Sequence, residues 1–314
     1  MKKLVILLII LLVLFIAWIS PASNSSDSFV SSVTTSELED EDNYVFDPEI
    51  IQAILPISEE SSASVEIPSV VSLPNVDPAS QGFSVYATSP GITIYSQEAT
   101  YLLVIDLNQA GIRALHNATG DVLGPGIWDG NDTAFRSKAL GDYLSQGGNE
   151  NFACAFNGQF FKMVKYPTGL AAPLKANGEI ITYGWETKFH KGEKLMLEVW
   201  PDRTRITPLD KNRFENSDAV DIITGLTALA NKKPKSVVGR TFVGTHGEST
   251  LMVLVSPSSN QRQMESTLKS LGAEVIMMLD GGGSTQLSCR INGSEQVLRY
   301  SERLIPQAIY VYSH

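Results

Sequence analysis

The longest uninterrupted hydrophobic run lies at the N-terminus of the chain. Sixteen apolar residues, Leu4 to Ile19, follow Lys2 and Lys3 and precede the small-residue stretch Ser20-Pro21-Ala22. Lysines before an apolar core and small residues after it are typical of a secretory signal, whereas a spanning helix needs about 20 apolar residues. Residues 1–22 are therefore predicted to be a signal peptide or a membrane anchor, with the lysines inside and the rest exported.

The next segment, 23–81, has no hydrophobic periodicity. Between residues 23 and 80 there are twelve acidic residues and no Lys or Arg, and Ser is frequent. A segment of this composition cannot bury a core, so we expect an acidic, Ser-rich disordered stalk. The hydrophobic pattern returns near Gly82, and residues 82–314 are expected to form one folded domain.

Strand-length apolar runs dominate this domain. They occur at 91–97, 99–108, 151–157, 249–256, 274–280 and 305–312. A helix is predicted at 131–148, where Phe135, Leu140, Tyr143 and Leu144 lie roughly on one side before a glycine stop. A second helix is predicted at 260–273, where Met264, Leu268 and Leu271 follow the i, i+4, i+7 spacing.

The C-terminal third predicts a strand, a helix and a strand in succession, which implies a parallel, right-handed crossover. This places Asp280 and the glycines after it at the carboxyl end of a parallel strand, where ligands of such sheets bind. Asn292-Gly293 predicts a hairpin further on. The expected fold class is α+β, a strand-rich mixed sheet with a β-α-β crossover before the Asp-Gly-Gly-Gly-Ser turn, in a single domain.

Charge and composition exclude several classes of protein. The net charge of −10 belongs to the stalk, because acidic and basic residues are equal in number after residue 80. The domain therefore has no basic surface for nucleic acid. The four His and two Cys residues show no zinc spacing, and no Gly-x-Ser-x-Gly nucleophile elbow occurs. No cofactor and no metal are predicted, although a lone cation held by carboxylates and carbonyls leaves no signal in a sequence.

The stretch "MLDGGGSTQL", from Met278 to Leu287, is the strongest candidate for a site. Three successive glycines let backbone N–H groups converge on an anion. The stretch is not a P-loop, because the Lys-Ser/Thr pair is missing. Asp280 before the glycines and Ser284 after them favour a site in which a substrate approaches the main chain closely. A purely structural turn is the alternative.

Two further patterns carry candidate chemistry. In "FACAFNGQFF" the strand breaks at Asn157-Gly158, and Asn157 can hold either a sugar hydroxyl or its own turn. In "VVGRTFVG" the lone Arg240 follows apolar residues, which predicts a buried guanidinium with a carboxylate or phosphate partner. A structural ion pair is the alternative for Arg240.

The two cysteines lie close to these motifs in the sequence. Cys154 and Cys289 are each within six residues of a motif, and disulfides persist in exported proteins. The sequence does not supply the Cα separation that a disulfide needs. We interpret the pair as two buried free thiols in preference to a disulfide.

Taken in order, the motifs resemble the phosphodiester glycosidase family over approximately residues 95–313. The segments that carry the resemblance are "AFNGQFF", "PTGL", "GLTAL", "GRTFVG", "LDGGGSTQL" and "RLIPQAIYV". The chain departs from the family where Gln159 and Lys162 replace a glycine and an acid. It departs again where Ala228 follows Gly225-Leu226-Thr227 without the usual proline, and where Gln307 replaces an asparagine. These departures affect substrate identity more than the core of the site.

The resemblance implies an exported hydrolase that cuts a sugar-1-phosphodiester at the bond between the anomeric carbon and the phosphate oxygen. It implies that the Asp280 carboxylate faces the anomeric carbon, as nucleophile or electrostatic stabiliser. Arg240 and the N–H groups of Gly281, Gly282 and Gly283 would hold the phosphate. Asn157 is the third catalytic candidate beside Asp280 and Arg240, and it would position sugar hydroxyls together with Ser284 and Gln286. The remaining substrate-binding candidates are Gly158 and Thr241. Asp221 and Glu186 are both open as a second carboxylate, and so is retention or inversion of the anomeric centre.

Two other functions stay open at this stage. The domain could be a non-catalytic module that binds cell-surface glycans, because the bulky Gln159 could narrow the cleft. It could also be a phosphodiesterase that cuts the bond to phosphorus. All three readings have a sugar phosphodiester or surface glycan as partner, no nucleic acid, and a membrane only through residues 1–22 if these are not cleaved.

Overall fold

The computed structural model describes residues 70, 71, 73, 76–162, 166–186 and 192–314. The predicted signal or anchor, and the predicted stalk up to residue 69, lie outside the described residues. Across the described ranges no helix has both the length and the apolar character needed to cross a membrane. Leu73 is buried, and the N–H of Val71 donates to Thr93 Oγ1 at 2.8 Å. Contacts of the folded part therefore begin before the expected start at Gly82.

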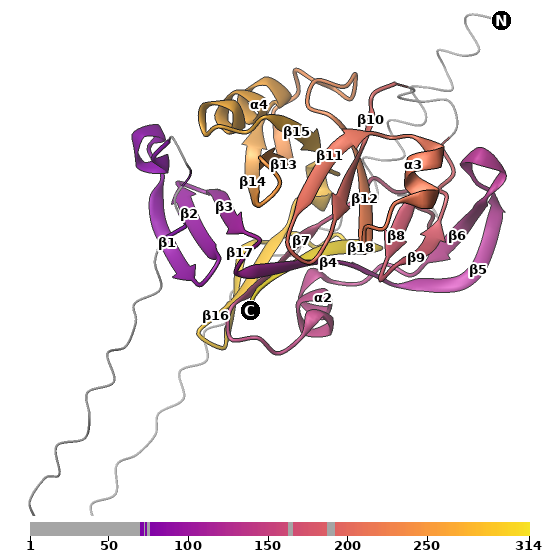
Figure 1. Ribbon diagram of the computed structural model, residues 1–314, viewed down its shortest axis with the longest axis horizontal. Coiled ribbons are helices and arrows are strands. Elements are labelled where there is room, and N and C mark those ends of the chain that lie inside the picture. The colour runs from indigo at the N-terminus through magenta and orange to yellow at the C-terminus, as the bar shows by residue number, and fades with distance from the viewer. Residues whose placement is uncertain (1–69, 72, 74–75, 163–165, 187–191) are drawn as a thin grey trace, which may run out of the picture. The chain divides into compact units, whose positions relative to one another are not determined.

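The larger of two main sheets has eleven strands (Figure 1). Nine of them follow the order β1-β2-β3-β14-β13-β15-β12-β10-β11, while β8 pairs with β12 and β9 pairs with β8. Their bounds are β1 Ser84–Ser89, β2 Ile92–Gln97, β3 Thr100–Asp106, β8 Leu174–Ala176, β9 Glu179–Thr182, β10 Lys194–Val199, β11 Thr204–Pro208, β12 Asp221–Thr227, β13 Val238–His246, β14 Thr250–Ser259 and β15 Val275–Met278.

The smaller main sheet has five strands in the order β17-β16-β7-β18-β4, and β5 and β6 form a separate pair. Their bounds are β4 Ala110–His116, β5 Ala118–Pro125, β6 Asn131–Phe135, β7 Ala153–Asn157, β16 Leu287–Ile291, β17 Ser294–Arg299 and β18 Gln307–Ser313. The described residues also contain three short 3-10 turns, η1 Pro78–Gln81, η2 Ile127–Asp129 and η3 Gly282–Ser284.

Alternating apolar positions build the core in layers. Leu103 of the larger sheet and Phe156 of the smaller sheet lie in the same cluster, between the sheets. Leu102 points to the opposite face of its strand and packs with residues of α4, Gln261–Ser270. The outer face of the smaller sheet is covered by α2, Leu140–Gly147. The domain is therefore an α+β fold with the layer order helix, sheet, sheet, helix.

The helix predicted at 131–148 is only half correct. Residues 131–135 form the strand β6, and the helix α2 starts at Leu140. Phe135 belongs to the core between the sheets, whereas Tyr143 and Leu144 pack on the outer face of the smaller sheet. One continuous helix could not place these side chains in two different cores, and tertiary packing overrides the local pattern.

Both predicted strands around α4 exist, but the expected mixed sheet with parallel neighbours does not. β14 and β15 each pair antiparallel with β13, which lies between them. Every strand pairing in the described residues is antiparallel. The sequence pattern specifies the direction of two successive strands but not which third strand separates them.

Local signals fix α4 and the β16–β17 hairpin as predicted. The Asn260 side chain accepts a hydrogen bond from the Gln263 N–H, and Gln263 Oε1 accepts one from the Asn260 N–H, both at 3.0 Å. This reciprocal capping box stabilises the first turn of the helix. In the hairpin, Asn292 and Gly293 have φ of 52° and 77°, as a tight turn of the favoured type requires.

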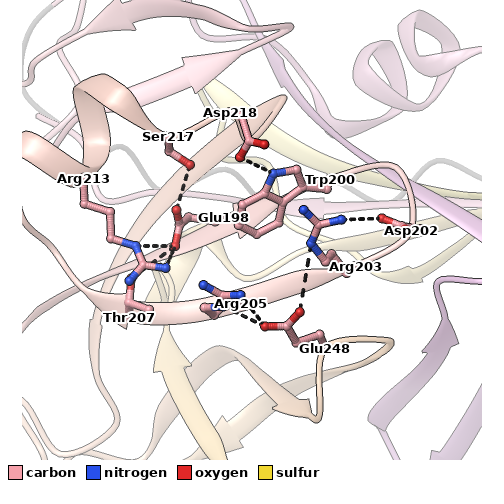
Figure 2. Close-up of polar contacts among 10 residues, drawn as sticks. All are labelled: Glu198, Trp200, Asp202, Arg203, Arg205, Thr207, Arg213, Ser217, Asp218 and Glu248. Carbon is pink, nitrogen blue, oxygen red and sulfur yellow. Dashed lines mark hydrogen bonds and ion pairs between the residues drawn. The ribbon is translucent and has the colours of Figure 1, made fainter.

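A polar network covers the outer end of the larger sheet, where β10 and β11 meet α3, Lys211–Asn216 (Figure 2). Glu198 on β10 is buried, and its carboxylate accepts hydrogen bonds from Arg213 Nε at 2.8 Å and Ser217 Oγ at 2.8 Å. Trp200 donates from Nε1 to Asp218 at 2.8 Å. The network neutralises one buried carboxylate and holds α3 against the sheet.

The two cysteines form a disulfide, so the free-thiol interpretation is wrong. Cys154 on β7 and Cys289 on β16 are directly paired residues of adjacent antiparallel strands, and their sulfurs are bonded. The register of two strands that are 135 residues apart in sequence brings them together. A single sequence does not show this register.

Candidate active site

The backbone of Asp280 is fixed where the two sheets meet. Asp280 follows β15, and its N–H donates to the carbonyl of Gly158 at 3.0 Å. The preceding N–H, of Leu279, donates to Thr241 of β13 at 2.9 Å. Gly158 follows the last residue of β7 in the smaller sheet, and a Cβ there would lie 1.5 Å from Gln307 Oε1. A side chain here would displace the Gln307 amide, whose Oε1 accepts from the Gln159 N–H at 2.9 Å, which explains the glycine of the Asn-Gly motif.

Asn157 organises this junction from beneath. Its Nδ2 donates to the Asp280 carbonyl at 2.7 Å, and its Oδ1 accepts from Thr241 Oγ1 at 2.7 Å and from the Gln286 N–H at 3.1 Å. The residue is 1% exposed. Hydrogen bonds of Asn157 thus join Thr241 and Gln286 to the Asp280 backbone. All three side chains are buried, so they lie too deep to contact a sugar directly.

A cavity of about 490 Å³ opens above the Asp280 junction. Its walls contain five of the candidates predicted from the sequence: Asp280, Arg240, Gly281, Gly282 and Gly283. The other five, Asn157, Gly158, Thr241, Ser284 and Gln286, lie behind the wall. The volume suits a small ligand of the size of a sugar phosphate, since ligand pockets are typically about 300–1,000 Å³.

Close backbone packing explains the glycine triplet, hereafter the glycine ribbon, Gly281–Gly283. A Cβ on Gly281 would lie 2.8 Å from the Gly239 carbonyl oxygen, and Gly282 has φ of 64°. A Cβ on Gly283 would lie 3.0 Å from the guanidinium of Arg303. The ribbon therefore leaves main chain, without side chains, on the cavity wall between Asp280 and Arg303.

Positive charge is in excess around the cavity. Four basic residues line it, Lys232, Lys233, Arg240 and Arg303, against two acidic ones, Asp280 and Glu186. The acidic and basic residues of the folded part are equal in number, so this excess is local. A cavity with surplus cations beside main chain that has no side chains favours an anionic ligand.

Arg240 does not form the ion pair that the sequence left open. Its guanidinium donates to the carbonyls of Lys233 at 2.9 Å and Ser236 at 3.0 Å, with a longer contact to the Ser259 carbonyl at 3.4 Å. Within the described residues Arg240 takes part in no ion pair. Burial lowers the pKa of Arg240 from its ordinary value. The three carbonyls that accept from its guanidinium are neutral, so they do not offset its positive charge.

Burial dominates the electrostatics of Asp280. It raises the pKa of Asp280 to about 6, while Ser284, the Gly281 N–H and the cations Lys232 and Arg303 act in the opposite direction. Ser284 lies near enough to lower this pKa, although no hydrogen bond of normal geometry joins its Oγ to the carboxyl in the described part of the chain. A carboxyl that changes charge near pH 6 in a cleft is typical of a functional site.

Three aromatic side chains and Arg303 line the cavity but were not among the residues predicted for the site. Phe160, Phe161 and Trp185 line the cavity, and the Lys162 ammonium lies 4.9 Å from the Trp185 ring. Arg303 lies in the cavity wall, and Gln286 Nε2 donates to its carbonyl at 2.9 Å. The phenylalanines follow the Asn-Gly motif and could have been found by extending it, whereas Trp185 and Arg303 could not.

Of the two candidates for a second carboxylate, Glu186 and Asp221, only Glu186 lies at the cavity. Glu186 is buried in the wall of the cavity, 3.9 Å from the Lys194 ammonium. Asp221 lies elsewhere, and its oxygens accept from the N–H groups of Ala114 at 3.1 Å and Asn177 at 2.8 Å. Glu186 therefore shares a cavity with Asp280, and Asp221 has a structural role.

Gln159 does not narrow the cavity. Its side chain is buried and points away, donating from Nε2 to the carbonyl of Ala172 at 3.1 Å and to Thr224 Oγ1 at 2.8 Å. The substitution of glycine by glutamine thus adds contacts between β12 and the chain after β7 without closing the site. No group of three or more His, Cys, Asp or Glu side chains arranged as metal ligands occurs in the described ranges.

Comparison with known proteins identifies the family. A phosphodiester glycosidase family model matches residues 150–312, which include every residue of the cavity wall, and the chain belongs to this family. No curated protein sequence matches significantly.

Solved structures give only distant likenesses. The zebrafish N-acetylglucosamine-1-phosphodiester α-N-acetylglucosaminidase catalytic domain, auto-inhibited by its pro-peptide, is 13% identical, with a TM-score of 0.49 over 74% of this chain and 88% of that one. A hypothetical protein from Synechocystis is 12% identical, with a TM-score of 0.41 over 74% and 61%. A putative exported protein from Burkholderia pseudomallei is 10% identical, with a TM-score of 0.41 over 70% and 74%.

Proposed function

We propose that the protein is an exported glycosidase that hydrolyses a sugar-1-phosphodiester at the anomeric carbon–oxygen bond. The observation that carries the proposal is that Asp280, the glycine ribbon and a surplus of cations line one cavity in a member of the phosphodiester glycosidase family. A carboxylate suits a carbon centre that becomes positive, and the cations suit the phosphate attached to it.

In this mechanism the substrate phosphate lies over the glycine ribbon, within reach of Arg240 and Arg303. The Asp280 carboxylate faces the anomeric carbon and stabilises the positive charge that develops as the bond to the phosphate oxygen breaks. The bonding electron pair leaves with the phosphate, which is stabilised by the same cations. Water supplies the new oxygen on the sugar, and one of its protons goes to the released phosphomonoester.

Glu186 is the second carboxylate in this scheme, because it shares the cavity with Asp280. It would accept the proton of the attacking water, and this proton then passes through solvent to the released phosphomonoester. A phosphomonoester leaves readily without a strong acid, so protonation of the leaving group is not assigned to any residue.

The test is incubation of the purified chain with an N-acetylglucosamine-1-phosphodiester in ¹⁸O-labelled water. We expect reducing sugar to appear with the label in the sugar. Label in the phosphate would mean cleavage at phosphorus and would make the protein a phosphodiesterase. Saturable binding without turnover across a panel of sugars would make it a glycan-binding module. Asp280→Asn should abolish sugar release, and unchanged release would show that the acid is wrongly assigned.

Export rests on two features. The predicted signal or anchor at 1–22 precedes the domain in sequence, and the domain contains a disulfide between Cys154 and Cys289. Disulfides persist in oxidising compartments and are rare in the cytosol. We therefore place the catalytic domain outside the cytoplasm. The expected stalk, 23–81, is shortened at its C-terminal end, because Val71, Leu73 and Pro78–Gln81 belong to the folded part. Fractionation of expressing cells, with protease protection of the intact chain, tests this placement.

A further inference from the structure

Exposed apolar side chains lie on the two chain segments that border the glycine ribbon, 237–238 and 300–304. Val237 and Val238 are 58% and 37% exposed, and Tyr300 and Leu304 are 66% and 51% exposed. Val238 itself lines the cavity. Single exposed apolar residues are normal on a protein surface, whereas several on adjoining segments indicate a binding surface. We call these four residues the apolar rim.

The two segments of the apolar rim adjoin through the glycine ribbon. A Cβ on Gly239, next to Val238, would lie 2.6 Å from the carbonyl oxygen of Gly282. On the other side the Ser301 hydroxyl, next to Tyr300, donates to the carbonyl of Gly283. The apolar rim therefore brackets the part of the cavity where the phosphate is proposed to bind.

The aromatic residues of the cavity belong to a different wall. The Ala171 N–H donates to the Phe160 carbonyl at 2.7 Å, and the Trp185 N–H donates to the Leu170 carbonyl at 3.2 Å. These backbone bonds join the segments that carry Phe160 and Trp185 into one layer. Flat aromatic faces in this wall suit the apolar face of a sugar ring. The ring would lie there and the phosphate on the ribbon, so the second ester group of the phosphate would leave over the apolar rim.

We propose that this second ester group is an alkyl or prenyl chain, so that the substrate is a lipid-linked sugar phosphodiester. The proposal rests on the function proposed above and specifies its substrate class. A glycerol aglycone has no apolar surface to place on the four residues. A second sugar could stack on Tyr300 alone, whereas the other three residues, Val237, Val238 and Leu304, are aliphatic. A hydrocarbon chain removes them from water as it binds. The reaction is unchanged, since water replaces the phosphate oxygen on the sugar and the products are free sugar and an alkyl phosphate.

The experiment compares three diesters of α-N-acetylglucosamine 1-phosphate, with methyl, glycerol and octyl as the second ester group. For the intact protein we expect kcat/KM for the octyl diester to exceed that for the methyl diester at least tenfold, because burial of two to three methylene groups changes binding by about ten- to hundredfold. The glycerol diester should be no better than the methyl diester.

Variants locate the effect. The double substitution Val237→Ser and Leu304→Ser should reduce the octyl-to-methyl ratio of kcat/KM to within about threefold of unity. Val85→Ser is the matched control, because Val85 is 51% exposed and lies on β1, at the far edge of the larger sheet. It should leave the ratio unchanged.

The outcomes separate this inference from the proposed function. Cleavage of the methyl and octyl diesters with equal kcat/KM would refute the apolar aglycone and leave the glycosidase standing. A preference for the octyl diester that survives in the double variant would show that the apolar rim does not bind the chain. If none of the three diesters is cleaved, both the glycosidase function and the apolar aglycone are refuted.

Discussion

Replacement of Asp280 by Asn is expected to stabilise the fold at neutral and alkaline pH. The pKa of Asp280 is raised to about 6 in the folded protein against 3.8 for an ordinary aspartate, chiefly by burial. Between these two pH values the folded state binds more protons than the unfolded state, so the free energy of unfolding falls as pH rises. The loss of stability caused by ionising the buried Asp280 carboxyl is absent below about pH 4 and complete above about pH 7. The pKa difference corresponds to about 3 kcal/mol.

Asparagine cannot ionise, so Asp280→Asn removes this cost. The assay is urea denaturation of the intact protein and the variant at pH 4 and pH 8, with the disulfide kept oxidised. We expect the two proteins to be close in stability at pH 4 and the variant to be more stable at pH 8 by up to about 3 kcal/mol. Asp121→Asn on β5 serves as the control for the loss of one negative charge at an exposed site. A stability difference that does not change with pH, or that grows towards acid, would refute the argument.

The remaining predictions concern catalysis and packing. Because Asp280 must be ionised for its assigned role, kcat/KM should fall as pH drops through about 6, and a fall above pH 6 instead would make it a general acid. Asn157→Ala should lower kcat by about 10²-fold in steady-state assays, since its three hydrogen bonds place Asp280; an unchanged kcat would contradict that positioning role. Gly283→Ala should force Arg303 aside and raise KM, with circular dichroism unchanged; an unchanged KM would separate Arg303 from phosphate binding. Arg213→Ala should lower the free energy of unfolding by about 3 kcal/mol, because it leaves Glu198 buried and unpaired, whereas loss of the exposed Arg205–Glu248 pair by Arg205→Ala should cost less than about 1 kcal/mol; equal losses would argue against the burial effect.

Local patterns predicted what depends on neighbours in the sequence. The i, i+4, i+7 spacing of Met264, Leu268 and Leu271 predicted α4, and the Asn292-Gly293 dipeptide predicted the hairpin. The Asp-Gly-Gly-Gly stretch gave the centre of the cavity, because an acid beside bare main chain is itself a local pattern.

Features that depend on strand register were not predictable in this way. The Cys154–Cys289 disulfide needs β7 beside β16, and the insertion of β13 between β14 and β15 needs the whole order of the sheet. The sequence predicts that Asn157 contacts a sugar, whereas in the structure it holds the Asp280 backbone from behind the cavity wall. Nothing in the Asn-Gly dipeptide shows that the Asp280 backbone lies against Asn157. Arg303 was missed because its partner in the cavity, Gly283, is fixed by tertiary packing.

The junction beneath Asp280 makes the position of its carboxylate sensitive to how the two sheets pack against each other. One backbone hydrogen bond ties the acid to the chain leaving β7, and the bond of its neighbour Leu279 ties it to β13. A slip of a few tenths of an ångström between the sheets would therefore move the carboxylate while the core is still intact. Substitutions deep between the sheets, far from any ligand, should first appear as slow enzymes and only later as unfolded ones.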